Sequence, residues 1–206
     1  MHNEAKQFTM FVKRILPYYF TGRHVLDVGS GDINGNNQFL FENCSYEGND
    51  VIAARNVTIV SKTKDLPFGP ETFDTIISTE CFEHDPEYRE SFLKIYDMLK
   101  PDGLFCFTCA STGRSEHGTR RTTPSDSYGT VGNIDEMVDY YKNLTETDLN
   151  DVLNLNERFS SWDTYYNSNT RDLYFLGIKK GNSNIALEKY TNHSVSCSTV
   201  TSSTSR

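Results

Sequence analysis

Apolar residues follow two different spacings along this chain, and the spacings predict alternating strands and helices. Over residues 3–16 they recur at helical spacing, and Pro17 ends that pattern. A second helical pattern covers residues 86–100, where Pro101 and Gly103 follow. Short apolar runs between and after these segments are typical of buried strands. We expect such strands at residues 24–28, 46–51, 57–60, 73–78 and 104–109.

The second half of the chain predicts smaller elements around a long loop. Residues 111–133 are polar, and a loop longer than about 15 residues in a compact domain is usually functional or disordered. The residues from Thr145 to Asp148 resemble a capping box, with Asp in place of Glu, and predict the start of a helix. We also expect helices after Gly35 and over residues 134–141, and strands at residues 158–166 and 172–179.

Composition limits the classes of partner. The 206 residues carry a net charge of −8, so the chain lacks the basic surface that nucleic-acid binding requires, and a nucleic-acid substrate is disfavoured. We expect one domain over residues 1–181 and a disordered Ser/Thr-rich tail over residues 182–206. Because no secretory or membrane-spanning segment is seen, we expect a soluble, cytoplasmic protein that does not bind membranes.

The cysteines point to the same compartment. Five are present, an odd number without metal-type spacing, which is typical of reduced thiols. Cys106 and Cys109 form a C-x-x-C pair, but they lie on an apolar strand. We therefore expect them to be buried, without a redox or metal role.

A glycine-rich turn follows the first predicted strand. Gly29 and Gly31 allow the chain to turn sharply and a ligand to approach the backbone, and a helix beginning there would direct free N–H groups at that ligand. Asp50 comes about 20 residues later, at the end of the next strand, where an acid accepts hydrogen bonds from a ribose. The next glycine is Gly35, one position later than in the dinucleotide fingerprint. The pattern predicts a nucleoside site and argues against a nicotinamide enzyme.

The motifs that follow identify the class of nucleoside. Asp65-Leu66-Pro67-Phe68 precedes the strand from Phe73 to Ser78; Glu83-His84 comes next, and Leu99-Lys100-Pro101-Asp102-Gly103 ends the second helix. In this order the chain resembles the class I S-adenosylmethionine-dependent methyltransferases, specifically the type 11-like group. The resemblance implies a Rossmann-like α/β fold: a doubly wound, mostly parallel seven-stranded sheet with a C-terminal antiparallel hairpin and helices on both faces.

The same resemblance implies a site for S-adenosylmethionine along the strand ends. Members of the family place an acid for the adenine amino group where this chain has Lys62, so we expect the backbone of the next two residues to recognise the ring. The cofactor-binding residues implied are Asp27, Gly29, Ser30, Gly31, Asp50, Val51, Thr63, Lys64, Ser78 and Thr79.

The acceptor side is predicted from the long loop and from the Glu83-His84 pair. His117 and His84 are the candidate general bases, because a histidine titrates near neutral pH, although His84 in such a pair more often makes only local hydrogen bonds. The predicted substrate-binding residues are Arg114, His117, Arg120, Arg121 and Tyr128, whose arginines suit an anionic group. The sequence predicts no metal site.

Two functions are compatible with these patterns. The first is methyl transfer from S-adenosylmethionine to an oxygen or nitrogen of a small-molecule or glycan acceptor. The second is an inactive methyltransferase-like module that binds a protein partner, which Lys62 and the irregular glycine spacing favour.

Overall fold

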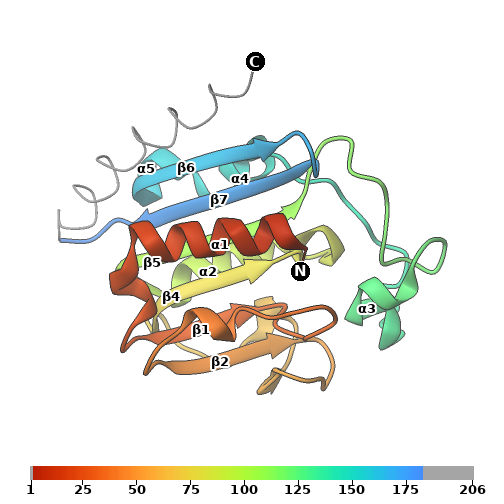
Figure 1. The fold of residues 1–206 in the computed structure, drawn as a ribbon, viewed down its shortest axis with the longest axis horizontal. Coiled ribbons are helices and arrows are strands. Elements are labelled where there is room, and N and C mark those ends of the chain that lie inside the picture. The colour runs from red at the N-terminus through yellow and green to blue at the C-terminus, as the bar shows by residue number, and fades with distance from the viewer. Residues whose placement is uncertain (1, 183–206) are drawn as a thin grey trace, which may run out of the picture.

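Seven strands form one sheet in the order β3-β2-β1-β4-β5-β7-β6 in a computed structural model that describes residues 2–182 (Figure 1). Strands β1 to β5 pair in parallel, and β7 runs antiparallel to both of its neighbours, β5 and β6. The strands are β1 (His24–Val28), β2 (Ser45–Asp50), β3 (Ile59–Val60), β4 (Phe73–Thr79), β5 (Leu99–Ala110), β6 (Phe159–Asn167) and β7 (Asp172–Lys179). The predicted sheet and its C-terminal hairpin are confirmed.

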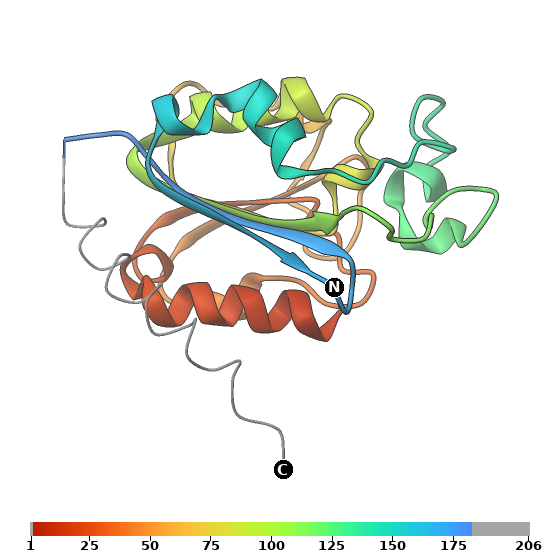
Figure 2. The ribbon, with the colours of Figure 1, turned by 90° about the horizontal axis from the view of Figure 1, so that it is seen from above.

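Helices cover both faces of the sheet, as Figure 2 shows. One face is covered by α1, and the other is covered by α2, α4 and α5, while α3 lies beyond the end of the sheet. The helices are α1 (Asn3–Ile15), α2 (Tyr88–Met98), α3 (Tyr128–Val131), α4 (Glu146–Leu153) and α5 (Leu155–Arg158). The strand order changes direction between β1 and β4, and doubly wound sheets bind ligands at the carboxyl ends of the strands at such a point.

Aromatic side chains form the core on the α2 side of the sheet. Phe107 on β5 is fully buried and lies between Phe92 and Phe175, at ring-centroid distances of 5.5 and 5.4 Å. Phe82, which begins the 3-10 turn Phe82–His84 after β4, meets the same ring edge-on at 5.2 Å. This cluster holds the segment that carries Glu83 and His84 against the sheet.

We expect Phe107→Ala to lower the free energy of unfolding by about 3–5 kcal/mol, because it removes a ring from a close-packed core. Urea unfolding followed by circular dichroism measures the change. Phe39→Ala is the matched control: that ring is 49% exposed, so its loss should cost under about 1 kcal/mol. Equal effects of the two substitutions would contradict this description of the core.

The predicted helix after Gly35 is wrong. Only one 3-10 turn, Gln38–Leu40, forms there. Side chains take the place of a helix, because Asp32 accepts hydrogen bonds from the Gly35 N–H at 2.8 Å and from the Asn36 amide at 3.0 Å. Asn and Asp favour such local bonds over helix. The glycine-rich turn is therefore not followed by a helix N-terminus, and its N–H groups are oriented without a helix dipole.

The predicted helix at 134–141 is also wrong. Isolated turns replace it, and the short helix α3 lies before it, inside the segment predicted as loop. Asn133 adopts a left-handed conformation with φ of 51°, which ends the helical path after α3. Further on, the side-chain hydroxyl of Thr130 and the backbone N–H of Arg120 donate to the carbonyl of Val138, so this stretch is tied to the loop instead of coiling on itself.

Other local predictions are confirmed. Thr145 and Asp148 form the reciprocal capping box of α4, and Asp148 accepts the Thr145 N–H at 2.9 Å. Cys106 and Cys109 are fully buried, and burial raises the pKa of both thiols. The predicted tail at 182–206 lies, apart from Asn182, outside the described residues.

None of the helices within residues 2–182 is both long enough and apolar enough to cross a bilayer.

Candidate functional site

A glycine-rich turn at the carboxyl end of β1 meets the end of β2. Gly29 has φ of 67°, a conformation that other residues rarely adopt. The Gly31 N–H donates to Oδ2 of Asp50 at 3.0 Å, and the Val51 N–H donates to Oδ1 at 2.7 Å. A Cβ on Gly31 would lie 2.7 Å from Asp50 Oδ2 and would overlap the ring of Tyr128. The turn therefore needs glycine to let backbone, carboxylate and ring approach one another.

A second carboxylate lies beneath this turn. Asp27 is fully buried and accepts hydrogen bonds from the Tyr46 hydroxyl at 2.5 Å and the Asn37 amide at 3.0 Å. Burial raises the pKa of Asp27 to about 6, while the hydrogen bonds from Tyr46 and Asn37 act in the opposite direction. Burial likewise raises the pKa of Asp50. A bound cation would stabilise the ionised form of both acids.

Lys62 is neutralised by its neighbours. Its ammonium pairs with Glu87 at 2.8 Å and with Glu136. The next residue, Thr63, is buried and donates to the Asn49 side-chain oxygen at 3.2 Å. The cation that replaces the expected acid is therefore held by two carboxylates, and the backbone beside it borders the cleft.

These residues border a cavity of about 220 Å³. Twelve of the residues predicted from the sequence line it, which brings the two halves of the predicted site together, whereas Lys64, Ser78, Arg120 and Arg121 do not line it. The twelve are Asp27, Gly29, Ser30, Gly31, Asp50, Val51, Thr63, Thr79, His84, Arg114, His117 and Tyr128.

The arginines of the 111–133 loop do not gather in the cavity. Arg120 pairs with Asp139 at 2.5 Å, and Arg121 pairs with Glu116 at 2.9 Å. Arg114 does reach the cavity, but its guanidinium is 3.3 Å from the buried carboxylate of Asp172 and donates to the Thr170 carbonyl at 2.7 Å. The structure thus uses these charges to hold the loop together.

We expect the double substitution of Arg120 and Arg121 by alanine to leave S-adenosylhomocysteine affinity within about twofold, because both side chains lie outside the cavity. Isothermal titration calorimetry measures the affinity. A loss greater than about tenfold, with the fold intact, would place the two arginines in the binding site.

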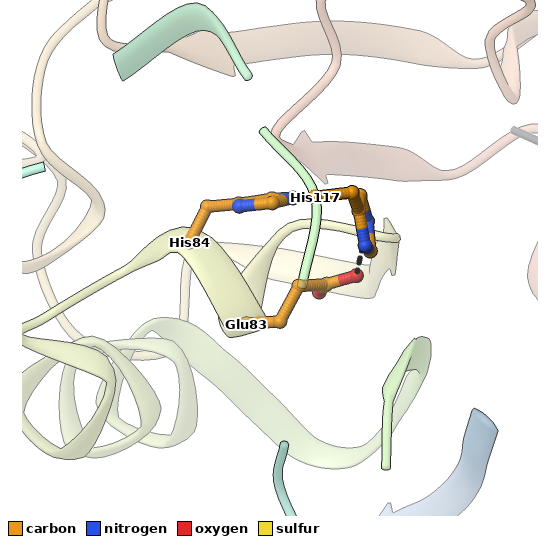
Figure 3. A group of neighbouring side chains, drawn as sticks. All are labelled: Glu83, His84 and His117. Atoms are coloured by element: carbon orange, nitrogen blue, oxygen red, sulfur yellow. Dashed lines mark ion pairs between the residues drawn. The ribbon is translucent and has the colours of Figure 1, made fainter. Parts of the chain in front are cut away.

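Two imidazoles that line the cavity lie beside a buried carboxylate (Figure 3). Glu83 and His84 come from the turn after β4, and His117 comes from the long loop. His117 Nε2 lies 3.9 Å from Glu83 Oε1. The imidazole rings of His84 and His117 are 4.9 Å apart and nearly perpendicular. The ring of Tyr141 packs against both imidazoles, at 5.7 and 5.0 Å.

The surroundings distinguish the two histidines. Nδ1 of His117 lies 3.1 Å from the Ser115 carbonyl, so it carries the proton and leaves a lone pair on Nε2. Burial, with a smaller contribution from His117, lowers the pKa of His84 to about 3. His84 is therefore a weak base at neutral pH, whereas the geometry of His117 leaves its Nε2 lone pair available. Burial, aided by the charge of Glu80, raises the pKa of Glu83.

Residues 26–107 match the family model described as Methyltransferase domain. This part of the chain is a methyltransferase domain. Similar solved structures hold S-adenosylmethionine or S-adenosylhomocysteine, which supports S-adenosylmethionine as the methyl donor.

Solved structures share the fold of this methyltransferase. One is the 1,6-didemethyltoxoflavin-N1-methyltransferase of Burkholderia thailandensis, with a TM-score of 0.59 and 15% identity over 87% of this chain and 79% of that one. Another is phosphoethanolamine N-methyltransferase 2 of Haemonchus contortus, with a TM-score of 0.59 and 16% identity over 85% of this chain and 53% of that one. The YcgJ protein of Bacillus subtilis has a TM-score of 0.55 and 14% identity over 88% of this chain and 100% of that one. The methyltransferase spans about half the length of the Haemonchus enzyme.

The cleft of the methyltransferase fits the cofactor of its family. Two buried acids, Asp27 and Asp50, border it, and neither forms an ion pair with a described lysine or arginine within 4 Å. A cationic ligand with a ribose matches both features.

Sequence reasoning missed two groups of the methyltransferase. Glu83 belongs to a quoted motif, but burial of its carboxylate against His117 depends on a loop that only the structure places. His2 also lines the cavity, and its Nε2 lies 2.9 Å from Asp172 and 3.3 Å from Glu80. Hydrogen bonds to Asp172 and Glu80 raise the pKa of His2 to about 10. The recurrence of Glu-His at 83–84 and 116–117 was the available signal for the first group; none marked His2.

Proposed function

We propose that this methyltransferase moves the methyl group of S-adenosylmethionine to a hydroxyl or amino group of a small-molecule or glycan acceptor. The observation that carries the proposal is the shared cavity: the acid at the end of β2 and the His117 lone pair line the same 220 Å³ space. The structures of the Burkholderia and Haemonchus methyltransferases each contain a bound small molecule, 1,6-didemethyltoxoflavin in the first and phosphomonomethylethanolamine in the second. This supports an acceptor of similar size.

On the donor side, Asp50 would accept hydrogen bonds from the ribose hydroxyls, and the buried Asp27 would balance the cationic methionine end. Thr63, beside Lys62, would border the adenine through its backbone. Bound S-adenosylmethionine supplies an electrophilic methyl group. The chain contributes alignment, which in favourable cases lowers a barrier by about 7–11 kcal/mol.

On the acceptor side, His117 would activate a hydroxyl. It lines the cavity, and its Nε2, which carries the lone pair, lies 3.9 Å from Glu83 Oε1. This lone pair either takes the hydroxyl proton directly or holds a metal ion that makes the hydroxyl more acidic. An amine acceptor needs less help, because its lone pair is already available.

An anionic group on the acceptor has weaker support. Of the predicted arginines only Arg114 lines the cavity, and it is already paired with Asp172. Neutral hydroxyl compounds and sugars therefore belong in the first acceptor panel, beside phosphorylated ones.

Two assays test the proposal. Calorimetric titration of the purified chain with S-adenosylhomocysteine is expected to give micromolar or tighter binding. Transfer of labelled methyl groups from S-adenosylmethionine to the acceptor panel then identifies the substrate class. Absence of cofactor binding by folded protein would overturn the enzymatic function and favour the binding-module alternative.

A further inference from the structure

Three side chains with electron-pair donors lie together at the acceptor side of the cleft, where His84 and His117 line the cavity. One ligand atom each from Glu83, His84 and His117 lies within 4.8 Å of the other two (Figure 3). Glu83 has no exposed surface, and His84 is 6% exposed. The group therefore lies at the buried end of an open cleft, where a small ion has access.

The buried Glu83 carboxyl group lacks ordinary hydrogen-bond partners. Neither of its oxygens has a hydrogen bond of ordinary geometry, although the N–H groups of Glu83 and Ala110 approach it. No lysine or arginine within residues 2–182 lies within 4 Å of it, and His117 Nε2, at 3.9 Å, is too far for a hydrogen bond. Buried charges in proteins are paired or bind metals.

Each imidazole has a ring nitrogen that makes no hydrogen bond. The Ser115 carbonyl fixes the His117 tautomer with Nε2 free, the arrangement by which outer contacts orient metal-binding histidines. Nδ1 of His84 is buried and has no hydrogen-bond partner. Gly118, with φ of 71°, passes so close to this ring that a Cβ there would lie 2.6 Å from His84 Cε1. The loop therefore closes directly over His84.

A histidine–carboxylate base without metal does not account for these contacts as well. Such a pair holds its atoms at about 2.6–3.2 Å, with a proton between them. Here the gap is 3.9 Å, and one ligand atom of His84 lies within 4.8 Å of both other groups. Two ligands of one tetrahedral zinc ion lie about 3.4 Å apart, so small side-chain rotations would bring all three atoms to bonding distance.

We propose that Glu83, His84 and His117 bind one divalent first-row transition metal ion, with Zn²⁺ as the reference ion, beside the methyl-donor cleft. Two imidazoles with one carboxylate favour such an ion over Mg²⁺, which prefers oxygen ligands. Three protein ligands leave a coordination position for the acceptor, as in catalytic zinc sites.

This inference rests on the proposed function and deepens it, because it assigns the acceptor an oxygen. The acceptor hydroxyl would bind the ion, which lowers the pKa of the hydroxyl, and its proton would pass to water. The oxygen would then form a bond to the methyl carbon as the carbon–sulfur bond breaks. The electron pair of that bond leaves with S-adenosylhomocysteine.

A second histidine–carboxylate group lies nearby, and both of its carboxylates already contact a cationic or hydroxyl group. His2, Glu80 and Asp172 lie together, yet Asp172 pairs with both His2 and Arg114, and Glu80 accepts the Thr108 hydroxyl at 2.7 Å. It serves as an internal comparison for the metal experiment.

Metal content tests the proposal directly. The full chain, stripped with EDTA and dialysed against Zn²⁺, is expected to retain one equivalent per chain. His117→Gln and Glu83→Gln should each weaken binding by at least about 100-fold. His24→Gln and His2→Gln should retain the equivalent: His24 lies at the opposite end of β1, with Nδ1 3.2 Å from the Thr72 carbonyl, and His2 belongs to the comparison group. Failure of wild type to bind Zn²⁺, or equal binding by His117→Gln, would overturn the proposal.

Cobalt substitution adds a spectroscopic measurement. Co²⁺ bound to two imidazoles and a carboxylate should give visible absorption bands that His117→Gln abolishes. Substitution of the fully buried Glu83 puts folding at risk. The His117→Gln variant therefore carries the test, because the His117 side chain lies on the loop and is 20% exposed. Bands that persist in His117→Gln would contradict the assigned ligands.

The outcome is separable from that of the proposed function. S-adenosylhomocysteine titration of the EDTA-treated chain reports the donor site without metal. Cofactor binding without Zn²⁺ binding would overturn the metal site alone. Zn²⁺ binding without cofactor binding would support the site and overturn the proposed function.

Discussion

Asp50→Ala is expected to weaken S-adenosylhomocysteine binding by at least about 100-fold. The carboxylate of Asp50 would form two hydrogen bonds to the ribose, and bonds to a charged group are each worth about 1.5–3 kcal/mol, with 1.4 kcal/mol per tenfold in affinity. The substitution also frees the Gly31 N–H, which now donates to Asp50 at 3.0 Å. Calorimetric titration measures the loss.

Two variants of the same strand make this result specific. Asp50→Asn keeps one acceptor oxygen and should lose about tenfold, between wild type and alanine. Glu47→Ala, earlier on β2, removes an acid that bonds Thr58 outside the cavity and should bind like wild type. Unchanged affinity of a folded Asp50→Ala variant would show that the ribose does not bind at the end of β2.

His117→Gln is expected to lower methyl-transfer turnover by about 100- to 10,000-fold, the usual contribution of a group that activates an acceptor. S-adenosylhomocysteine affinity should stay within about threefold, because the donor contacts lie at the ends of β1 and β2. Labelled-methyl transfer to the acceptor identified in the panel gives kcat and KM. His24→Gln controls for loss of any imidazole and should retain wild-type rates.

A rise in KM without a fall in kcat would assign His117 to acceptor binding only. Addition of EDTA separates the two means of activation. If a metal ion binds the acceptor hydroxyl, methyl transfer should stop on chelation and return with Zn²⁺. If His117 takes the proton directly, chelation should leave the rate unchanged.

The parts of the fold that the sequence predicted are those set by local patterns. Apolar runs identified β1 and β4 because both faces of a central strand are buried, and the Thr145–Asp148 pair identified α4 because a capping box is made within four residues. The helix expected after Gly35 failed for the opposite reason. There the Asn37 amide donates hydrogen bonds to Asp27 on β1 and Thr79 on β4. Contacts between residues so far apart in the sequence are not part of any local pattern.

The candidate site divides in the same way. The glycine turn and Asp50 follow from strand order, since neighbouring parallel strands end at one edge of the sheet. The roles of the loop residues depend on how the loop folds back. Arg120 and Arg121 suit an anion by residue type, but the folded loop pairs them with carboxylates of the chain itself. The burial of Glu83 beside His117 likewise depends on the folded loop.

The position of β7 has a consequence for how the chain is made. This last strand of the described region lies between β5 and β6, is buried along its whole length, and pairs with residues far earlier in the sequence, such as Ile178 with Leu104. Pairings between distant residues slow folding. During synthesis, the apolar edge of β5 remains unpaired until β7 has left the ribosome. The nascent chain is therefore most prone to aggregate in the interval before Lys179 emerges, and a shortened chain ending before Asp172 would remain in that state.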